Sequence, residues 1–541
     1  MIIKFFLVLL LIFTCSSAEI TLNDIDSKPA SRAKDFMIWQ YLKQNINSSE
    51  ADKAYQQVNN KKNNKLLYAY SKKTKNQEIK KKISCKKKSN LFKIKDSECL
   101  ELAFSPYKAL KYTNYQRNVL TKRLKSKPKV KILNILNEKH LAKNYKSYDA
   151  DTILTLFNNT GYRYRRKYLN MQLNKEFLDS LTSSWRISQF IKTVIHDDKL
   201  DKLQQSLFYI DGQKLNSKSN FFLALNSLRH SEKDYAIKYF KLSRSQAKYK
   251  IDVDKNNFWL YKITKHKDYL NKLLLSMDIN IYTLFAREKM SVDFKNYFSS
   301  LETNGEVSKK SLLDPFEWNK ILKEIKSTEK DELFNLAKLY KQKEMLPVQA
   351  LIIQKANQHN MHGYMMPYDK HLKGLSLDSK ALVYALMRQE SNMIPSALSR
   401  SYALGLMQIM PFVTDDISKR IKEPIKNYDE MFIPKNNIRY SRAHIKWMQK
   451  SLYHPLFMAY AYNGGMGFFK KHLLKGNFSK GEYEPFLSME MMSNSESREY
   501  GKRVLANYVM YKKVMGDEIS IAHLFDILTQ PKMTDRFRKQ G

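Results

Sequence analysis

Short amphipathic helices follow one another along most of this sequence, and this pattern restricts the fold more than any other feature. Segment 31–45 places Phe36, Trp39 and Leu42 at three-residue steps, as one buried helix face requires. Only 14 glycines and 13 prolines occur in 541 residues, too few for the many turns of an all-β chain. The sequence therefore predicts an all-α protein.

Between residues 29 and 345 the amphipathic segments come in pairs. Segment 221–243 reads as two helices separated by a short polar break, and similar pairs occur at 258–276 and 331–357. No strict repeat length connects them, so we expect a degenerate α-solenoid of stacked helix pairs, ring-like or concave and suited to a long ligand. An irregular helical bundle without a binding role is the alternative.

The length of the chain and a break in its pattern predict two domains. A chain of 541 residues exceeds what a single hydrophobic core usually supports. Helical periodicity stops in segment 362–379, which contains a proline and two glycines. We therefore place a boundary near Met366, with the solenoid over residues 19–365 and a second domain over residues 366–541.

The N-terminus has the pattern of a secretory signal peptide. A lysine at position 4 precedes an apolar run, and Ser16 and Ala18 occupy the −3 and −1 positions of a cleavage site. Residues 1–18 are therefore expected to be removed from an exported protein. A membrane-retained helix and a lipid-modified Cys15 are the alternatives.

Cleavage there would leave two of the three cysteines, Cys85 and Cys99. An even number of cysteines in an exported protein indicates a disulfide, and closing a loop of this length would stabilise the fold by roughly 3 kcal/mol. Two free thiols are the alternative. Neither cysteine has a neighbouring cysteine or histidine pair that would complete a zinc site, so we expect no metal and no cofactor.

The net charge of +42 favours anionic partners. In an exported protein these would be membrane head groups or a cell-wall polymer that carries carboxylates, rather than nucleic acid. The densest basic segments, 59–67 and 80–95, lie in the predicted solenoid, where a solvated helix face is the ordinary explanation. We expect at most peripheral membrane association, because no later stretch reaches about 18 consecutive apolar residues.

The second domain begins with a helix that ends in a carboxyl group. We expect this helix to start at Asp378 as N-cap and to place Val383, Met387 and Glu390 on one face. Burial and the helix dipole both disfavour a negative charge at that end, so the pKa of Glu390 is expected to be raised. Such a pKa suits a general acid near neutral pH, whereas a solvated glutamate is the commoner case in a last helical turn.

Two segments after this helix also carry polar residues in apolar surroundings. Pro395 ends helical continuation, and the serine-rich loop 396–401 that follows can hydrogen-bond a sugar or the backbone. "GLMQIMPF" should form a short helix in which Gln408, if buried, needs a partner, either a ligand or a backbone carbonyl.

Two later helices complete the set. In "AYNGG" an apolar helix stops at two glycines, which leaves Tyr462 and Asn463 at its exit. Segment 495–516 is an amphipathic helix that carries Glu496 and Tyr500 four residues apart. Alone, each segment is an ordinary helix stop or an ordinary surface helix.

Together, "QES", "GLMQIMP", "AYNGG" and "ESREY", in this order, resemble the lysozyme-like catalytic domain of the soluble lytic transglycosylases. The resemblance is strong over about residues 366–510, and the solenoid is similar to the helical ring of the large periplasmic members. It implies cleavage of the β-1,4 bond between N-acetylmuramic acid and N-acetylglucosamine in peptidoglycan glycan strands, without water and with 1,6-anhydro ends. It also implies a periplasmic protein, in contact with the cell wall or the outer membrane.

The resemblance also assigns roles to single residues. Glu390 matches the catalytic acid of the family. The substrate-binding residues that it implies are Ser399, Gln408, Met410, Tyr462, Asn463 and Glu496. One position departs from the pattern, because Tyr402 stands where the family commonly has glycine.

The spacing of acids bears on the mechanism. No second acid lies between Glu390 and Pro411, so one carboxyl group would act first as acid and then as base, and the substrate would supply the nucleophile. A hydrolytic muramidase on the same fold would need another acid, such as Asp415 or Asp416. A non-catalytic peptidoglycan-binding scaffold that recruits cell-wall synthesis or secretion machinery is the alternative of another class. Nucleic-acid binding rests on charge alone.

Overall fold

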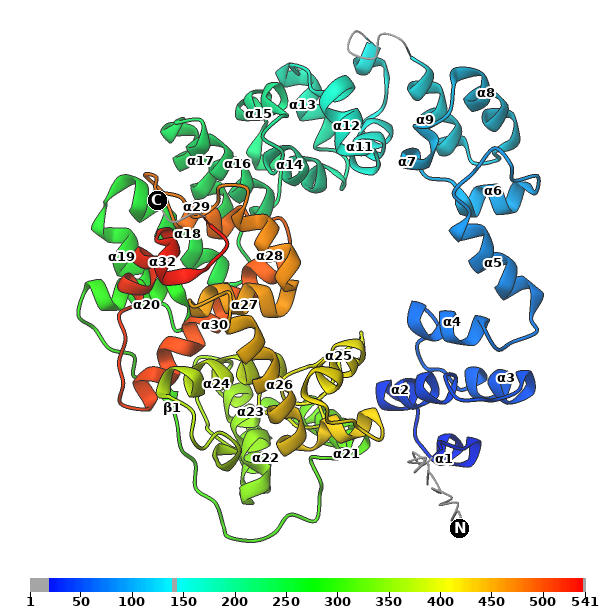
Figure 1. Ribbon diagram of the computed structural model, residues 1–541. Coiled ribbons are helices and arrows are strands. Elements are labelled where there is room, and N and C mark those ends of the chain that lie inside the picture. Colours follow the sequence, from blue (N-terminus) through cyan, green and yellow to red (C-terminus); the bar gives the residue numbers. More distant parts are fainter. Residues whose placement is uncertain (1–18, 139–143, 539–541) are drawn as a thin grey trace, which may run out of the picture. The chain divides into compact units, whose positions relative to one another are not determined.

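The computed structural model describes residues 19–138 and 144–538 (Figure 1). Within these residues the regular structure is helical, apart from two strands of two residues each, β1 (Tyr297–Phe298) and β2 (His362–Gly363). The all-α class is therefore confirmed. The predicted signal peptide lies outside the described residues. No helix in the described part of the chain is long and apolar enough to cross a bilayer.

The chain packs into two compact units. Unit 1 consists of Met1–Lys75, Phe298–Gln358 and Gly363–Gln449, and unit 2 of Asn76–Tyr297, His359–His362 and Lys450–Gly541. Each unit combines segments from both sides of Met366. The boundary at that residue stays a prediction about domains of the sequence.

Unit 1 contains the N-terminal helices and the helices around residue 400. They are α1 (Leu22–Asp26), α2 (Arg32–Tyr41), α3 (Ser48–Gln56), α4 (Asn64–Ser71), α21 (Pro315–Ser327), η5 (Lys330–Glu332), α22 (Leu333–Lys338), η6 (Lys343–Met345), α23 (Leu346–Ala356), η7 (Asp369–His371), α24 (Leu377–Ser391), α25 (Pro411–Ile421), η8 (Tyr428–Phe432) and α26 (Pro434–Gln449). The face that the sequence predicts for α2 is confirmed, because Phe36, Trp39 and Leu42 are all buried.

Unit 2 contains the long helical series and the C-terminal helices. The series is α5 (Gln77–Lys87), α6 (Ser97–Ala103), α7 (Pro106–Ala109), α8 (Asn114–Arg123), α9 (Lys127–Asn137), η1 (Tyr145–Ser147), α11 (Ala150–Asn159), α12 (Tyr162–Tyr164), η2 (Arg165–Leu169), α13 (Lys175–Leu181), α14 (Ile187–Ile195), α15 (Asp201–Ser206), η3 (Leu207–Tyr209), η4 (Gly212–Lys214), α16 (Ser217–Arg229), α17 (Lys233–Ser245), α18 (Lys250–Thr264), α19 (Lys267–Leu274) and α20 (Ile281–Lys289). The C-terminal helices are α27 (Pro455–Gly464), α28 (Met466–Leu473), α29 (Phe486–Glu490), α30 (Ser495–Val514), α31 (Ile521–Asp526), η9 (Ile527–Thr529) and α32 (Pro531–Thr534).

The helical series packs mainly between neighbours in sequence. Helices α16 and α17 form the hairpin that segment 221–243 predicts, and α17, α18, α19 and α20 then pack each on the next. Stacking of consecutive helices is the arrangement expected of a solenoid. The predicted disulfide is confirmed, since Cys85 of α5 is bonded to Cys99 of α6, with a Cα–Cα distance of 5.0 Å.

The helix ends follow local capping chemistry. Asn47 before α3 and Asn216 before α16 each accept a backbone N–H from the first turn with their side-chain oxygen. This bond satisfies one of the donors that the start of a helix leaves without a partner. The polar residues between apolar segments therefore also mark where the next helix starts. This is why the sequence pattern predicts the helices.

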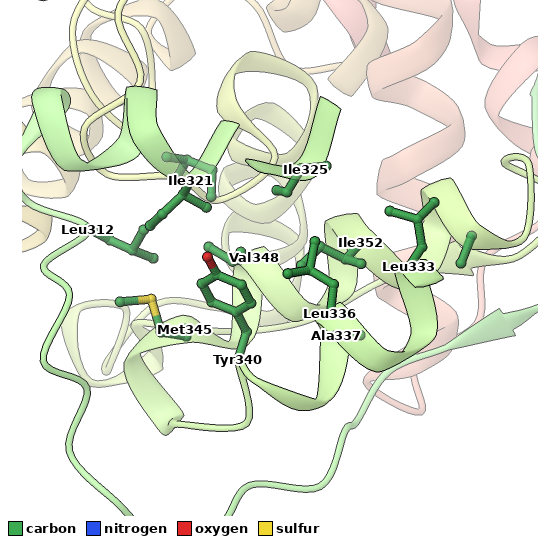
Figure 2. Packing of buried hydrophobic residues seen from close by; sticks show 12 residues of the cluster. Leu312, Ile321, Ile325, Leu333, Leu336, Ala337, Tyr340, Met345, Val348 and Ile352 are labelled. Carbon is green, nitrogen blue, oxygen red and sulfur yellow. The ribbon is translucent and has the colours of Figure 1, made fainter. Parts of the chain in front are cut away.

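A hydrophobic cluster supports the part of unit 1 that follows α24. Side chains of α21, α22 and α23 point toward one another in Figure 2, with Ile321, Leu336 and Val348 all nearly inaccessible to solvent. Ile394, three residues beyond the end of α24, belongs to the same cluster. The chain that follows Glu390 is thus packed on a helical core of its own unit.

Candidate active site

Helix α24 holds Glu390 in its last turn. The N-cap is Ser376, whose Oγ accepts the N–H of Ser379 at 3.3 Å, so the helix starts before the predicted cap Asp378. Asp378 instead lies in the first turn, where its charge complements the helix dipole. Val383 and Met387 are buried, as predicted, but so is every residue from Ala381 to Met387, whereas Glu390 is half-buried.

Contacts on both sides of Glu390 fix the end of α24. Arg388 Nε donates to the Gly363 carbonyl at 2.9 Å, and the Arg388 guanidinium lies 4.5 Å from the centre of the Tyr364 ring. Ser391 Oγ donates to the Leu406 carbonyl at 2.8 Å, which joins the helix to the following loop. This role of Ser391 was missed in the sequence, although the "ES" pair contains it.

The "GLMQIMP" segment is a turn and not the short helix that the sequence predicts. Leu404 pairs in antiparallel fashion with both Leu398 and Ile409. Gly405 and Gln408 have φ values of +72° and +46°, in the left-handed region that a right-handed helix does not contain. The loop after α24 therefore folds back on itself before α25 begins.

Two of the predicted substrate-binding side chains hold this loop together. Gln408 Nε2 donates to the carbonyls of Ala397 and Gly405 at 2.9 and 2.8 Å, so the backbone is the partner of its amide group. Ser399 Oγ accepts the N–H of Ala403 at 2.8 Å. Gln408, Ser399 and the neighbouring Met410 are all half-buried, so each keeps an accessible part.

Asn437 of α26 fixes the turn from within the protein. Its Oδ1 accepts the N–H of Met407 at 2.9 Å, and its Nδ2 donates to the carbonyls of Leu404 and Met431 at 3.0 and 2.8 Å. The residue is fully buried, and its amide is satisfied at both ends. Sequence reasoning missed it, because nothing distinguishes Asn437 from the adjacent Asn436 before the fold is known.

Tyr402, at the position where the resembled family commonly has glycine, joins the loop to the N-terminal helices of unit 1. Its φ is +62°, in the region that glycine adopts without strain. Its fully buried ring packs on Phe36 and Trp39 of α2, at centroid distances of 5.3 and 5.5 Å. Its hydroxyl donates to the Asp35 carbonyl at 3.4 Å, and burial raises the pKa of that hydroxyl.

The two acids of α25 are exposed and already have partners. Tyr428 Oη donates to both carboxylate oxygens of Asp415 at 3.0 Å, and burial, together with this carboxylate, raises the pKa of Tyr428. Arg420 Nε donates to Asp416 Oδ2 at 2.9 Å. In the described part of the chain, no group of three or more acidic, histidine or cysteine side chains is arranged to hold a metal ion.

The remaining predicted site residues belong to unit 2. Helix α27 ends at Gly464, and Gly465 follows with φ +87°, as the sequence predicts for a helix stop. Asn463 Nδ2 donates to Glu496 Oε1 at 3.4 Å, and Ser497 Oγ donates to Asn463 Oδ1 at 2.7 Å. The structure therefore brings the exit of α27 and the start of α30 together, with half-buried Tyr462 beside them in the chain.

Comparisons with known proteins agree with the sequence motifs. The family model of the transglycosylase SLT domain matches residues 375–484. The soluble lytic murein transglycosylase of Escherichia coli K12 is 30% identical over 207 residues, which are 37% of this chain and 32% of the relative. The protein of the same name from Salmonella typhimurium is 30% identical over 179 residues, 32% of this chain and 27% of the relative. The matches thus span between about a quarter and a third of the length of these relatives.

One solved structure shares the fold over nearly the whole chain. It is the complex of a 70-kDa soluble lytic transglycosylase with bulgecin A, at a TM-score of 0.52 and 14% identity, covering 92% of this chain and 89% of that one. This likeness concerns the fold alone, and it confirms the predicted combination of a helical solenoid with a lysozyme-like domain. The domain over residues 375–484 belongs to the transglycosylase SLT family, as the sequence motifs indicate.

Proposed function

We propose that this protein is a lytic transglycosylase that cleaves the β-1,4 bond between N-acetylmuramic acid and N-acetylglucosamine of peptidoglycan and leaves 1,6-anhydromuramic ends. The observation that carries the proposal is the half-buried Glu390 at the end of α24, within a matched SLT domain and fixed by the contacts of Arg388 and Ser391. A carboxyl group held on an apolar helix face is suited to donate a proton.

In the proposed reaction one carboxyl group serves two steps. Glu390 protonates the glycosidic oxygen as the bond from that oxygen to C1 breaks, and the N-acetyl group of the muramic sugar assists at C1. The Glu390 carboxylate then takes the proton of the C6 hydroxyl as the C6 oxygen bonds to C1. The proton count balances, water is not consumed, and Glu390 returns to its starting state.

The partners of the two acids on α25 favour this course over hydrolysis. A hydrolytic enzyme needs a second carboxylate that activates water or attacks the sugar. Asp415 is engaged by Tyr428 and Asp416 by Arg420, and both are exposed. Neither Asp415 nor Asp416 is therefore placed as the second, buried carboxylate that a hydrolytic enzyme would need beside Glu390.

We propose the same substrate-binding residues that the resemblance to the family implies. The accessible parts of Ser399, Gln408 and Met410 would line a glycan groove in unit 1. In unit 2, Tyr462 and the joined pair of Asn463 and Glu496 would contact the sugar. The signal-peptide pattern supports a periplasmic location, where peptidoglycan lies.

Product analysis tests the proposal. Purified protein is incubated with peptidoglycan, and released muropeptides are weighed by mass spectrometry; we expect 1,6-anhydro products, lighter by one water than hydrolysis products. The Glu390→Gln variant should lose activity by at least about 100-fold, since general acid–base catalysis contributes that much.

The control is Asp415→Asn, which should keep most of the activity and helical circular dichroism. Products heavier by one water would instead establish a muramidase. A wild-type protein that sediments with cell-wall sacculi but releases no product would establish the scaffold alternative.

A further inference from the structure

A dense group of lysines lies on α5 and on the loop that joins α5 to α6 in unit 2 (Figure 1). Segment 80–95 contains no acidic residue. It contains eight lysines, and all of them are exposed: Lys80, Lys81, Lys82, Lys86, Lys87, Lys88, Lys93 and Lys95. We call these lysines, together with Phe92 of the same loop, the α5 patch.

Acids that follow the α5 patch in sequence neutralise little of its charge. Lys81 Nζ pairs with Asp96 at 2.7 Å and with Glu98 at 3.5 Å. Asp96 is also the N-cap of α6, where its side chain accepts the Cys99 N–H at 2.7 Å. The lysines of the patch without an ion pair in the described residues are Lys80, Lys82, Lys86, Lys88, Lys93 and Lys95. The patch therefore favours an anionic partner.

The backbone of the α5 patch is held by its neighbours. The disulfide joins α5 to α6. Lys108 Nζ of α7 donates to the Lys88 carbonyl at 2.8 Å, and Arg123 Nη1 of α8 donates to the Phe92 carbonyl at 3.1 Å. The charges thus lie on a segment that the fold already orders, so binding does not require the backbone to be ordered first.

A turn over residues 91–94 places Phe92 in solvent. The Ile94 N–H donates to the Leu91 carbonyl at 3.2 Å, and both of these residues are buried. Between them, Phe92 is 36% exposed and Lys93 is exposed as well. The α5 patch therefore presents one phenyl ring at the tip of an anchored turn, with lysines before and after it in the chain.

This combination of side chains indicates which anionic partner fits. Single-stranded nucleic acids are bound through several aromatic side chains that stack on bases, and arginine forks suit phosphate recognition. In segment 80–95 every cation is a lysine, and Phe92 is the only aromatic residue. Lysines keep their charge at the level of lipid head groups, while a phenyl ring enters the boundary between head groups and acyl chains.

We infer that the α5 patch binds the surface of an anionic lipid bilayer, with the lysines at the head groups and Phe92 at the acyl boundary. The inference concerns a surface built without any residue of the candidate active site, and it does not rest on the proposed function. Its consequence is a peripheral attachment that weakens as salt is added, because the lysines are exposed.

Sedimentation with vesicles provides the first test. Protein without residues 1–18 is mixed with vesicles of phosphatidylglycerol and phosphatidylcholine in equal parts, or of phosphatidylcholine alone, and we expect binding to the anionic vesicles only. Each lysine near an anionic bilayer contributes about fivefold, so Lys86→Gln/Lys88→Gln/Lys93→Gln should weaken binding by at least about tenfold. The matched control removes three exposed lysines elsewhere in unit 2 and should bind as the wild type does: Lys241→Gln/Lys248→Gln/Lys267→Gln.

Phe92→Ala keeps every charge and provides the second test. It should weaken binding to the anionic vesicles by about fivefold, because a ring that enters the acyl boundary is lost, and leave binding to soluble polyphosphate unchanged. The control Phe334→Ala removes a ring that is 49% exposed outside the α5 patch and should bind as the wild type does. Helical circular dichroism checks that each variant is folded.

Three outcomes would overturn the inference. The wild type could fail to sediment with anionic vesicles, or the two triple-lysine variants could lose binding equally, which would assign it to net charge alone. Vesicle binding that Phe92→Ala leaves unchanged would identify the α5 patch as a site for a soluble polyanion instead of a bilayer.

Discussion

Tyr402 and Gly405 both have a left-handed backbone conformation in the loop after α24. The two positions differ in whether a side chain can be accommodated there. A non-glycine residue in that region costs about 1–2 kcal/mol, whereas burying a large apolar side chain contributes about 1.5–3 kcal/mol. Tyr402 is fully buried on α2, so its packing offsets its strain. At Gly405 no side chain fits, because an added Cβ would lie 2.2 Å from the Met431 carbonyl oxygen.

Gly405→Ala should therefore destabilise unit 1 by more than its backbone strain alone. The matched control is Gly374→Ala, since Gly374 has φ +78° and nothing within 4 Å of an added Cβ. We expect a loss of about 1 kcal/mol for the control and at least about 2 kcal/mol more for Gly405→Ala, measured by urea unfolding. Equal losses in the two variants would show that the close contact is relieved at little cost.

At the scale of elements, a buried carboxyl group of α18 orders the start of α20. Asp254 Oδ2 accepts hydrogen bonds from Ser276 Oγ and Asn280 Nδ2, both at 2.8 Å. Asn280 is the N-cap of α20. Burial raises the pKa of Asp254 to about 7, against these two hydrogen bonds and with the help of Asp278. The helix pair therefore carries a group that changes charge near neutral pH.

This raised pKa predicts a dependence of stability on pH. Because the folded pKa lies above the unfolded value, the contribution of Asp254 is fully present below about pH 4 and is lost as pH rises through about 7. Asp254→Asn removes the titration. The difference in unfolding free energy between wild type and Asp254→Asn should shift in favour of the variant from pH 4 to pH 8.

Urea unfolding at several pH values measures that difference. Taking the difference cancels the contribution of other groups, including buried His454, whose burial lowers its pKa to about 3. A difference that stays constant across this range would show that Asp254 titrates with an ordinary pKa in the folded protein.

At the scale of the whole molecule, buried charges join helices that lie far apart in the sequence. Within unit 2, Lys502 Nζ of α30 donates to Glu490 Oε1 and Oε2 of α29 at 2.8 and 2.9 Å, and Tyr282 Oη of α20 donates to Glu490 Oε1 at 2.6 Å. The Lys502 and Glu490 side chains are 1% and 2% exposed. The Glu490 carboxylate therefore connects α20 of the helical series with α30 of the C-terminal helices.

Removing one charge of the buried Lys502–Glu490 pair should lower the free energy of unfolding more than removing both charges. Lys502→Met leaves a buried carboxylate without its closest cation and should lower the unfolding free energy by about 3–5 kcal/mol. The double variant Lys502→Met/Glu490→Gln removes both charges and should recover at least about 1 kcal/mol. Thermal or urea unfolding of both proteins measures this, and a double variant less stable than Lys502→Met would contradict a dominant charge–charge interaction.

The sequence by itself determined the features that depend on neighbouring residues. The three-residue steps of Phe36, Trp39 and Leu42 identified a buried face, and the glycine pair after Asn463 identified a helix end, because helix geometry and capping act within a few residues. The motifs around Glu390, taken in their order, resemble those of the family whose SLT domain model matches residues 375–484. The even pair of Cys85 and Cys99 that an export signal would leave predicted the disulfide, which the structure contains.

Only the tertiary structure decided how the loop around Tyr402 is built. The turn at "GLMQIMP" was predicted as a helix, since its apolar spacing fits one, but the turn is held by Asn437 and by Ser391, which act from outside the segment. Tyr402 is explained by Asp35 and its neighbours on α2, 367 residues away in the chain. Left-handed backbone and buried polar groups are stabilised by partners brought close through folding, and local sequence carries no record of which partners those are.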